Sequence, residues 1–335
     1  MRIASWNTRG LGNMSRGRMA GSLVNRFQIQ FLAIQETMVK VVDQPNLNEI
    51  WRHYAFDSLQ MEANGRSGGL LSIWRLDFFS LIQGWTRKHW IASILRYIPN
   101  NQIVLIVNVY APHNEQKKKA LWAQLIRIAN IWSGPLCFLG DFNSVCFPEE
   151  RLREVIDTNS IDSFNRFITQ ANIFDQCLFN DDFTREGAMG KFSRIDRVFI
   201  NSKWNMLWPD AILVTDQPDR SDHKPIIWAK KLLYWGPRPF RFNNSWLNKP
   251  GFIRFCESLW FGYSVFGWAA FRIGKKMRLL KGDLKIWGES HQDKDVTCLK
   301  EIENEIKRLK TCYKCRDLTH TELGDLAALK SFKKK

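Results

Sequence analysis

Short apolar runs, most of them closing on a polar residue, fill the first 230 residues and constrain the fold more than any other feature. Runs of this length that are bounded by turn signals are typical of buried β-strands. A polar residue that ends a buried strand lies at the rim of its sheet, where functional sites are usually found. The expected strands span residues 2–7, 31–36, 103–110, 136–141 and 195–200.

Helical periodicity occurs between some of these strands. Residues 116–132 place Leu121, Leu125 and Ile128 on one side of a helix, and residues 161–174 show the same spacing of apolar side chains. Strands that alternate with helices predict a layered α/β protein.

The composition bounds the class of protein. A chain of 335 residues suggests two domains, and 45% hydrophobic with 24% charged residues excludes wholesale disorder. The 49 Lys and Arg outnumber the 33 Asp and Glu, which gives a net charge of +16. Such a charge favours a polyanionic partner, with nucleic acid first and an anionic membrane surface second, although a basic enzyme without such a partner is the alternative.

Targeting, membrane and zinc signals are weak. The N-terminus has no apolar run of the signal-peptide type, and the longest aromatic-apolar stretch, residues 259–271, has 13 residues where a membrane span needs about 20. Seven scattered cysteines indicate free thiols in a reducing compartment, so we expect an intracellular protein. Cys312 and Cys315 form one Cys-x-x-Cys pair with only His320 nearby, which favours two thiols on a helix over a zinc site.

The character of the chain changes after Lys230. A break rich in Pro and Gly at 235–239 is followed by dense aromatics and a basic tail, and residues 231–335 hold 22 Lys and Arg against 11 Asp and Glu. Within the tail, Leu299, Ile302, Ile306 and Leu309 recur at the spacing of a helical seam, too short for an independent coiled coil. We therefore expect one domain over residues 1–230 and a basic, aromatic-rich helical extension over 231–335.

The polar residues near the strand ends define a chemistry when they are taken together. They include no second His for a zinc site, and the Gly65-Arg-Ser-Gly-Gly69 turn leads into an expected strand, without the helix that follows a Gly-x-Ser-x-Gly nucleophile elbow. Carboxylate and amide oxygens suit Mg²⁺, and Asp or His beside them can move protons, so the set indicates metal-assisted hydrolysis of a phosphate ester. The set is Asn7, Glu36, Asn108, Tyr110, Asp141, Asn143, Asp196, Asp222 and His223.

Six motifs occur in the order found in the endonuclease/exonuclease/phosphatase family, which has the DNase I-like fold. They are Trp6-Asn7, Gln35-Glu36-Thr37, Asn108-Val-Tyr-Ala-Pro112, Gly140-Asp-Phe-Asn143, Ser193-Arg-Ile-Asp196 and Ser221-Asp-His223. Residues 65–70 and 193–198 resemble the endonuclease domains of LINE-type retrotransposons without long terminal repeats, especially plant ones. Residues 240–246 and the stretch after them resemble the segment that leads to a reverse transcriptase in plant elements. No Tyr/Phe-x-Asp-Asp motif is present in residues 231–335, so we expect no polymerase activity.

The resemblance implies a four-layered α/β (α+β) sandwich of two mixed β-sheets flanked by helices, followed by the helical extension. It also implies roles for the polar residues. Glu36 resembles the principal metal ligand, with Asn7 and Asp222 close by, and Mg²⁺ is the expected ion with Mn²⁺ as the alternative. Tyr110 would contact the phosphate or the leaving group, and Asn143 would position phosphate or water.

The proton-handling residues are assigned by the same resemblance. Asp141 resembles the group that orients or deprotonates the attacking water, and His223 the group that contacts the scissile phosphate. Asp196 would hydrogen-bond His223, fix its tautomer and raise its pKa. The choice between Asp141 and His223 as the base stays open, as does the number of metal ions. The alternative for Asp196 is a salt bridge with Arg194 or Arg197.

One departure from related sequences concerns DNA contact. Relatives usually have Phe-Thr-Trp where this chain has Phe183-Thr-Arg185, and Arg185 could bind phosphate in place of the Trp. Arg185, Arg194 and Arg197 are predicted to contact nucleic acid.

The resulting hypothesis is a Mg²⁺-dependent DNA endonuclease that nicks one strand and derives from a retrotransposon. The resemblance further implies DNA as the partner, element RNA as a further partner of the extension, and the nucleus as the location. A preference for abasic sites and the oligomeric state stay open. The alternatives are a non-catalytic nucleic-acid-binding remnant of the element and a phosphoesterase that acts on inositol phosphates or lipids.

Overall fold

The computed structural model spans residues 1–335 and describes them apart from 12–13, 52–53, 66, 155–156, 217–220, 231–243, 268, 291–300, 303, 307, 310, 314–317 and 333–335. The predictions for Leu299, Cys315 and the break at 235–239 lie outside the described residues. The chain divides into two compact units, Met1–Leu232 and Leu233–Lys335.

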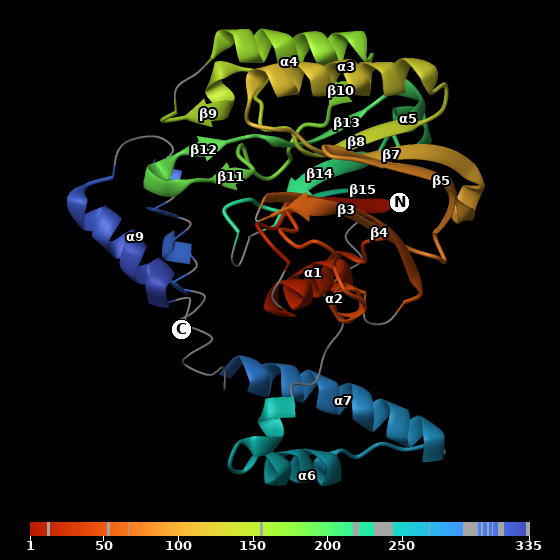
Figure 1. Cartoon of the computed structure of the whole chain (residues 1–335). Coiled ribbons are helices and arrows are strands. Elements are labelled where there is room, and N and C mark those ends of the chain that lie inside the picture. The colour runs from red at the N-terminus through yellow and green to blue at the C-terminus, as the bar shows by residue number, and fades with distance from the viewer. Residues whose placement is uncertain are drawn as a thin grey trace. The chain divides into compact units, whose positions relative to one another are not determined.

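Two six-stranded mixed sheets form the centre of the first unit (Figure 1). The first has the order β14-β15-β1-β2-β4-β3, and the second has the order β10-β13-β8-β7-β6-β5. The strands of the first sheet are β1 (Arg2–Asn7), β2 (Phe31–Gln35), β3 (Phe56–Asn64), β4 (Ser67–Arg75), β14 (Ala211–Thr215) and β15 (Ile226–Lys230). Those of the second are β5 (Phe79–Arg87), β6 (Trp90–Tyr97), β7 (Gln102–Tyr110), β8 (Leu136–Asp141), β10 (Phe174–Asp175) and β13 (Asp196–Ile200). The five strands expected from the sequence are all present.

The alternation of side chains between the two faces of each strand explains the layers of the fold. In β2, Phe31 and Ala33 pack between the two sheets, while Leu32 and Ile34 pack against helices on the outer face. Strands that are buried on both faces are apolar throughout, which is why these runs lack the polar alternation of an exposed sheet.

Helices cover the outer face of each sheet (Figure 1). The first sheet packs against α1 (Met14–Phe27) and α2 (Gln44–Ile50), and the second against α3 (Glu115–Ile131) and α4 (Thr158–Gln170). Asn114 caps α3 and Asp157 caps α4, each by accepting a hydrogen bond from a backbone N–H group. The predicted four-layered sandwich is confirmed.

Smaller elements complete the unit. A third sheet of order β11-β12-β9 lies beside the sandwich, and a short helix follows β13. These elements are β9 (Arg151–Leu152), β11 (Arg185–Glu186), β12 (Phe192–Ser193), α5 (Ser202–Leu207) and the 3₁₀ turns Ile98–Asn100, Pro148–Glu150 and Ala188–Gly190.

The second unit is helical where it is described. Phe252, Leu284 and Trp287 form one small core, and Ile302, Ile306 and Leu309 of the predicted seam pack with Leu318 and Leu326 in another. Among the described residues, no helix is long and apolar enough to cross a bilayer. The elements are the 3₁₀ turn Asn244–Asn248, α6 (Phe252–Gly262), α7 (Ala269–Ser290) and α9 (His320–Phe332).

Candidate active site

Two parallel strand pairs bring four predicted residues to one rim of the sandwich. In the first sheet, β1 and β2 run parallel with Asn7 opposite Gln35, so Glu36 follows at the rim. In the second sheet, β7 and β8 run parallel with Tyr110 opposite Asp141. The two rims meet, because the Asn7 side-chain amide donates to Asp141 Oδ2 at 2.9 Å.

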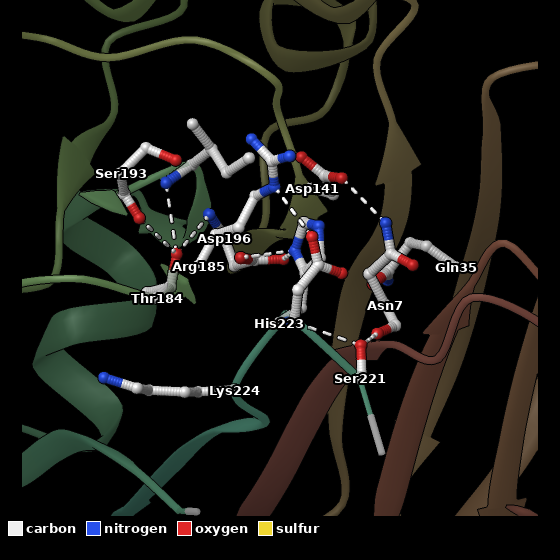
Figure 2. A network of polar contacts seen from close by, with 12 residues as sticks. Asn7, Gln35, Asp141, Thr184, Arg185, Ser193, Asp196, Ser221, His223 and Lys224 are labelled. Carbon is white, nitrogen blue, oxygen red and sulfur yellow. Dashed lines mark hydrogen bonds and ion pairs between the residues drawn. The ribbon is translucent and has the colours of Figure 1, made fainter. Parts of the chain in front are cut away.

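Two antiparallel strands add the remaining groups to the same rim. Strand β13 begins at Asp196, which lies opposite Asp141 at the end of β8. Strand β15 runs antiparallel to β1, so His223 precedes it beside the end of β1. Figure 2 shows Asn7, Asp141, Asp196 and His223 converging from these four strands or their ends. These residues are too far apart in the sequence for a local pattern to predict that their side chains meet.

Asn7 links two carboxylates. Its Nδ2 donates to Glu36 Oε1 at 2.8 Å as well as to Asp141, and its side chain is fully buried. The Tyr110 hydroxyl donates to the same Glu36 oxygen at 2.9 Å. Burial, followed by the charges of Glu36 and Asp141, raises the pKa of Tyr110, so this hydroxyl stays a donor.

Unusual backbone conformations aim the side chains at this rim. Glu36 and Asn143 have φ of 52° and 48°, a region that residues with a Cβ rarely adopt. Gly140 has φ of 144°, and a Cβ there would lie 1.9 Å from the carbonyl oxygen of Val109, so only glycine fits before Asp141. The Asn143 amide N–H then donates to Asp141 Oδ1 at 2.9 Å and fixes that carboxylate.

Asp196 and His223 form a buried ion pair. His223 Nδ1 lies 2.9 Å from Asp196 Oδ2, and each side chain is 2% exposed. Burial alone would lower the pKa of His223, but the charge of Asp196 and its hydrogen bond outweigh burial and raise the pKa to about 9. His223 is therefore an imidazolium at neutral pH, and its fixed Nδ1 leaves Nε2 for a substrate.

The pKa of Asp141 is higher than that of an exposed aspartate. Burial, followed by the charge of Asp196, raises its pKa to about 7, against the lowering effects of His223 and Asn7. A carboxylate whose pKa lies near the working pH suits a general base.

The residues at this rim fit a divalent metal ion. Within the described part of the chain, ligand atoms of Asp141, Asp196 and His223 all lie within 4.8 Å of one another. Glu36 approaches this cluster through the amide of Asn7 that it shares with Asp141. Three buried carboxylates face a single imidazolium here, and this excess of hard oxygen donors favours a cation such as Mg²⁺.

Two hydroxyl groups that carried no assigned role hold these residues in place (Figure 2). Ser221 Oγ donates to the Asn7 carbonyl at 2.8 Å and accepts the His223 amide N–H at 3.1 Å. Thr184 Oγ1 accepts the amide N–H of Asp196 at 3.0 Å. Both residues lie inside or beside recognised motifs, so their position in the sequence was the available signal.

The sequence around Lys118 gives no comparable indication that this residue supports the site. It falls within a run of lysines on a helix, where a solvated face is the usual expectation. The side chain is instead buried, and Nζ donates to the Asn143 carbonyl at 2.8 Å and pairs with Glu115. Lys118 therefore stabilises the turn that carries Asn143.

Asp222 has partners other than those predicted. The structure brings Glu36 and Asn7 into contact, but the carboxylate of Asp222 pairs with two arginines. Arg9 Nε lies 2.8 Å from Oδ1, and Arg185 Nε lies 3.1 Å from Oδ2. Arg185 is thus at the site, as expected, although its described partners are Asp222 and Glu154.

The predicted DNA contacts of Arg194 and Arg197 need correction. Arg197 has a fully buried side chain that pairs with Glu150 and Asp175, so it cannot reach a DNA backbone. Arg194 is 15% exposed and lies 2.8 Å from Asp175. Both arginines belong to one ion cluster with Glu150 and Asp175, and Asp196 pairs with His223 instead of either arginine.

Replacing Arg197 by methionine is expected to destabilise the protein by about 3 kcal/mol, because the buried carboxylates of Glu150 and Asp175 lose their main counter-charge. Denaturant unfolding of the first unit measures the effect. Exposed Arg87 provides the matched control, Arg87→Met, which should change the free energy of unfolding little. Equal stability of the two variants would contradict this interpretation of the cluster.

Comparison with known proteins identifies the class. The family model described as the endonuclease/exonuclease/phosphatase family matches residues 4–223, so the chain belongs to this family and the predicted resemblance is confirmed. Members of this class are nucleases and phosphatases that hydrolyse phosphate esters. A search of curated proteins finds no match.

Solved structures agree with the fold. The AP endonuclease LMAP from Leishmania major aligns with a TM-score of 0.53 and 13% identity, over 68% of this chain and 87% of that one. The 3'-5' exonuclease NExo from Neisseria meningitidis gives 0.53 and 17%, over 69% and 99%. The endonuclease domain of TRAS1, a telomere-specific non-LTR retrotransposon, gives 0.51 and 17%, over 68% and 96%.

Proposed function

We propose that this protein is a Mg²⁺-dependent DNA endonuclease that nicks one strand of a duplex and derives from a non-LTR retrotransposon. The observation that carries the proposal is the convergence of two groups at one rim. These groups are the carboxylates joined by Asn7 and the buried Asp196–His223 ion pair.

The protonation states support a division of labour. Asp141, with a pKa near 7, would take the proton of the attacking water, and Asn143 would hold that water or a phosphate oxygen. The His223 imidazolium would donate a hydrogen bond to the scissile phosphate as its charge grows. The geometry therefore favours Asp141 as the base. Glu36 and Asn7 would hold the Mg²⁺, which supplies Lewis-acid charge at the phosphate.

The choice of DNA and of a retrotransposon origin rests on charge and likeness. A net charge of +16 suits a polyanion, and the solved neighbours include a retrotransposon endonuclease domain and an AP endonuclease. The helix α7 carries Arg272, Lys275, Lys276, Arg278, Lys281 and Lys285, so we extend the proposal to element RNA as its partner. A DNA substrate makes the nucleus the proposed location.

Nicking of supercoiled plasmid tests the proposal. We expect open-circle product with Mg²⁺ and none with EDTA, because removing the metal removes its charge stabilisation and its activation of water. Product without metal would contradict metal dependence. Hydrolysis of inositol phosphates with no plasmid nicking would favour the phosphoesterase alternative. Plasmid binding with neither activity would favour the non-catalytic alternative.

A further inference from the structure

A carboxylate at the edge of the site holds two arginines. Asp222 pairs with Arg9 at 2.8 Å through Oδ1 and with Arg185 at 3.1 Å through Oδ2. The side chain of Arg9 is 43% exposed, that of Arg185 is 24% exposed, and that of Asp222 is 19% exposed. One partly buried carboxylate thus faces two arginines, which leaves a net positive charge at this edge of the site.

Backbone contacts fix this arrangement against the reaction centre. The Arg9 amide N–H donates to Asn7 Oδ1 at 3.1 Å, and Asp222 directly precedes His223 in the chain. Arg185 forms an isolated antiparallel bridge with His223, and Figure 2 shows both side chains in one network of polar contacts. Both guanidinium groups are therefore held by the carboxylate that directly precedes the residue proposed to contact the scissile phosphate.

The ion pairs continue away from the site and keep a positive excess. Arg185 Nη1 lies 3.6 Å from Glu154, and Glu154 lies 3.3 Å from Arg151 Nε. This series of ion pairs thus alternates three arginine side chains with two carboxylates. The carboxylates order the arginine side chains in advance, which reduces the entropy lost when a ligand binds. Planar guanidinium groups recognise phosphate oxygens through paired N–H donors.

We propose that Arg9 and Arg185, ordered by Asp222, form a subsite for the DNA phosphate next to the scissile one. This inference rests on the proposed function, since it assigns a part of the same substrate. Asp222 then serves this subsite and is not a metal ligand. Arg185, which stands where relatives usually have Trp, adds a charged contact to the DNA strand.

Binding without cleavage tests the subsite separately from the reaction. A 30-base-pair duplex is titrated in EDTA against the wild type, Arg9→Gln and Arg185→Gln, with Arg166→Gln on the outer face of α4 as the control for lost charge. Each subsite variant should raise Kd about tenfold and reduce the slope of log Kd against log salt by about one. The control should stay within about twofold of wild type.

A chemical change in the DNA locates the contact. Once the nicking site is mapped, methylphosphonate replaces one phosphate at a time on either side of it, and Kd is measured again. One flanking position should weaken wild-type binding about tenfold and leave Arg185→Gln unaffected. If every position weakens both proteins equally, or if the variants bind as wild type, the inference is overturned.

Asp222→Asn separates the subsite from a metal role. We expect Kd for the duplex to rise, with the Mg²⁺ concentration for half-maximal nicking unchanged. A shifted Mg²⁺ requirement with unchanged duplex binding would return Asp222 to the metal site and overturn the inference. If the wild type binds but never nicks and the Arg effects persist, the proposed function fails while the subsite stands. No binding by the wild type would overturn both.

Discussion

Asp141→Asn is expected to slow plasmid nicking by about 10⁴-fold at pH 7.5 while leaving the stability of the protein close to that of the wild type. The loss follows because an amide cannot accept the proton of the attacking water and binds a metal weakly. The stability follows because the folded protein raises the pKa of Asp141 to about 7, so its ionised form opposes folding. The asparagine removes that charge, which offsets the loss of one of the two hydrogen bonds that the carboxylate accepts from Asn7 and Asn143.

Nicking rates and thermal unfolding, measured on the same samples, check both halves of this prediction. Exposed Asp210 provides the matched control, since Asp210→Asn makes the same chemical change away from the rim. Substantial nicking by Asp141→Asn would exclude it as the base. A large fall in its unfolding temperature would show that the carboxylate is structural.

Asp196→Asn is expected to slow nicking by about 10³-fold at pH 8 and to change the pH profile. In the wild type, Asp196 raises the pKa of His223 to about 9 against the effect of burial. Without that charge, the lowering effect of burial on the pKa of His223 weighs more, and the imidazolium loses its proton at a lower pH than in the wild type. The alkaline limb of the profile should move from near 9 to a lower pH, so the variant loses less activity at pH 6 than at pH 8.

The same pair makes a prediction for stability. Since the folded pKa of His223 lies above the unfolded value of 6.5, the pair stabilises the protein fully below about pH 6.5. This contribution disappears as the pH rises through about 9. The difference in unfolding free energy between wild type and Asp196→Asn should therefore shrink from pH 6.5 to pH 9. An unchanged alkaline limb in the variant, or a constant difference in stability, would contradict the assigned protonation of His223.

Much of the fold follows from the apolar runs. A buried run that stops at Asn7 or Asp141 marks a strand end, because the polar side chain must reach the rim or find a partner. The order of the motifs, together with their family resemblance, then implied the two sheets and the shared rim. The contact of Asn7 with both Glu36 and Asp141 agrees with that implication.

The partners of the charged side chains could not be read in the same way. Arg197 and Asp222 each lie next to a predicted catalytic residue in the sequence, yet Arg197 is fully buried in an ion cluster and Asp222 pairs with arginines. Their contacts join positions 22 to 213 residues apart, and the direction of a side chain depends on the packing of both sheets. The burial of Lys118 could not be predicted for the same reason, since it depends on the turn at Asn143.

The central claim is that the rim centred on Asn7 is a metal-dependent phosphodiesterase site. The most direct measurement compares single-turnover nicking by the wild type, Glu36→Gln and the exposed control Glu62→Gln over a range of Mg²⁺ concentrations. We predict that Glu62→Gln matches the wild type and that Glu36→Gln loses at least about 10³-fold at every Mg²⁺ concentration. Wild-type nicking by Glu36→Gln would contradict the account.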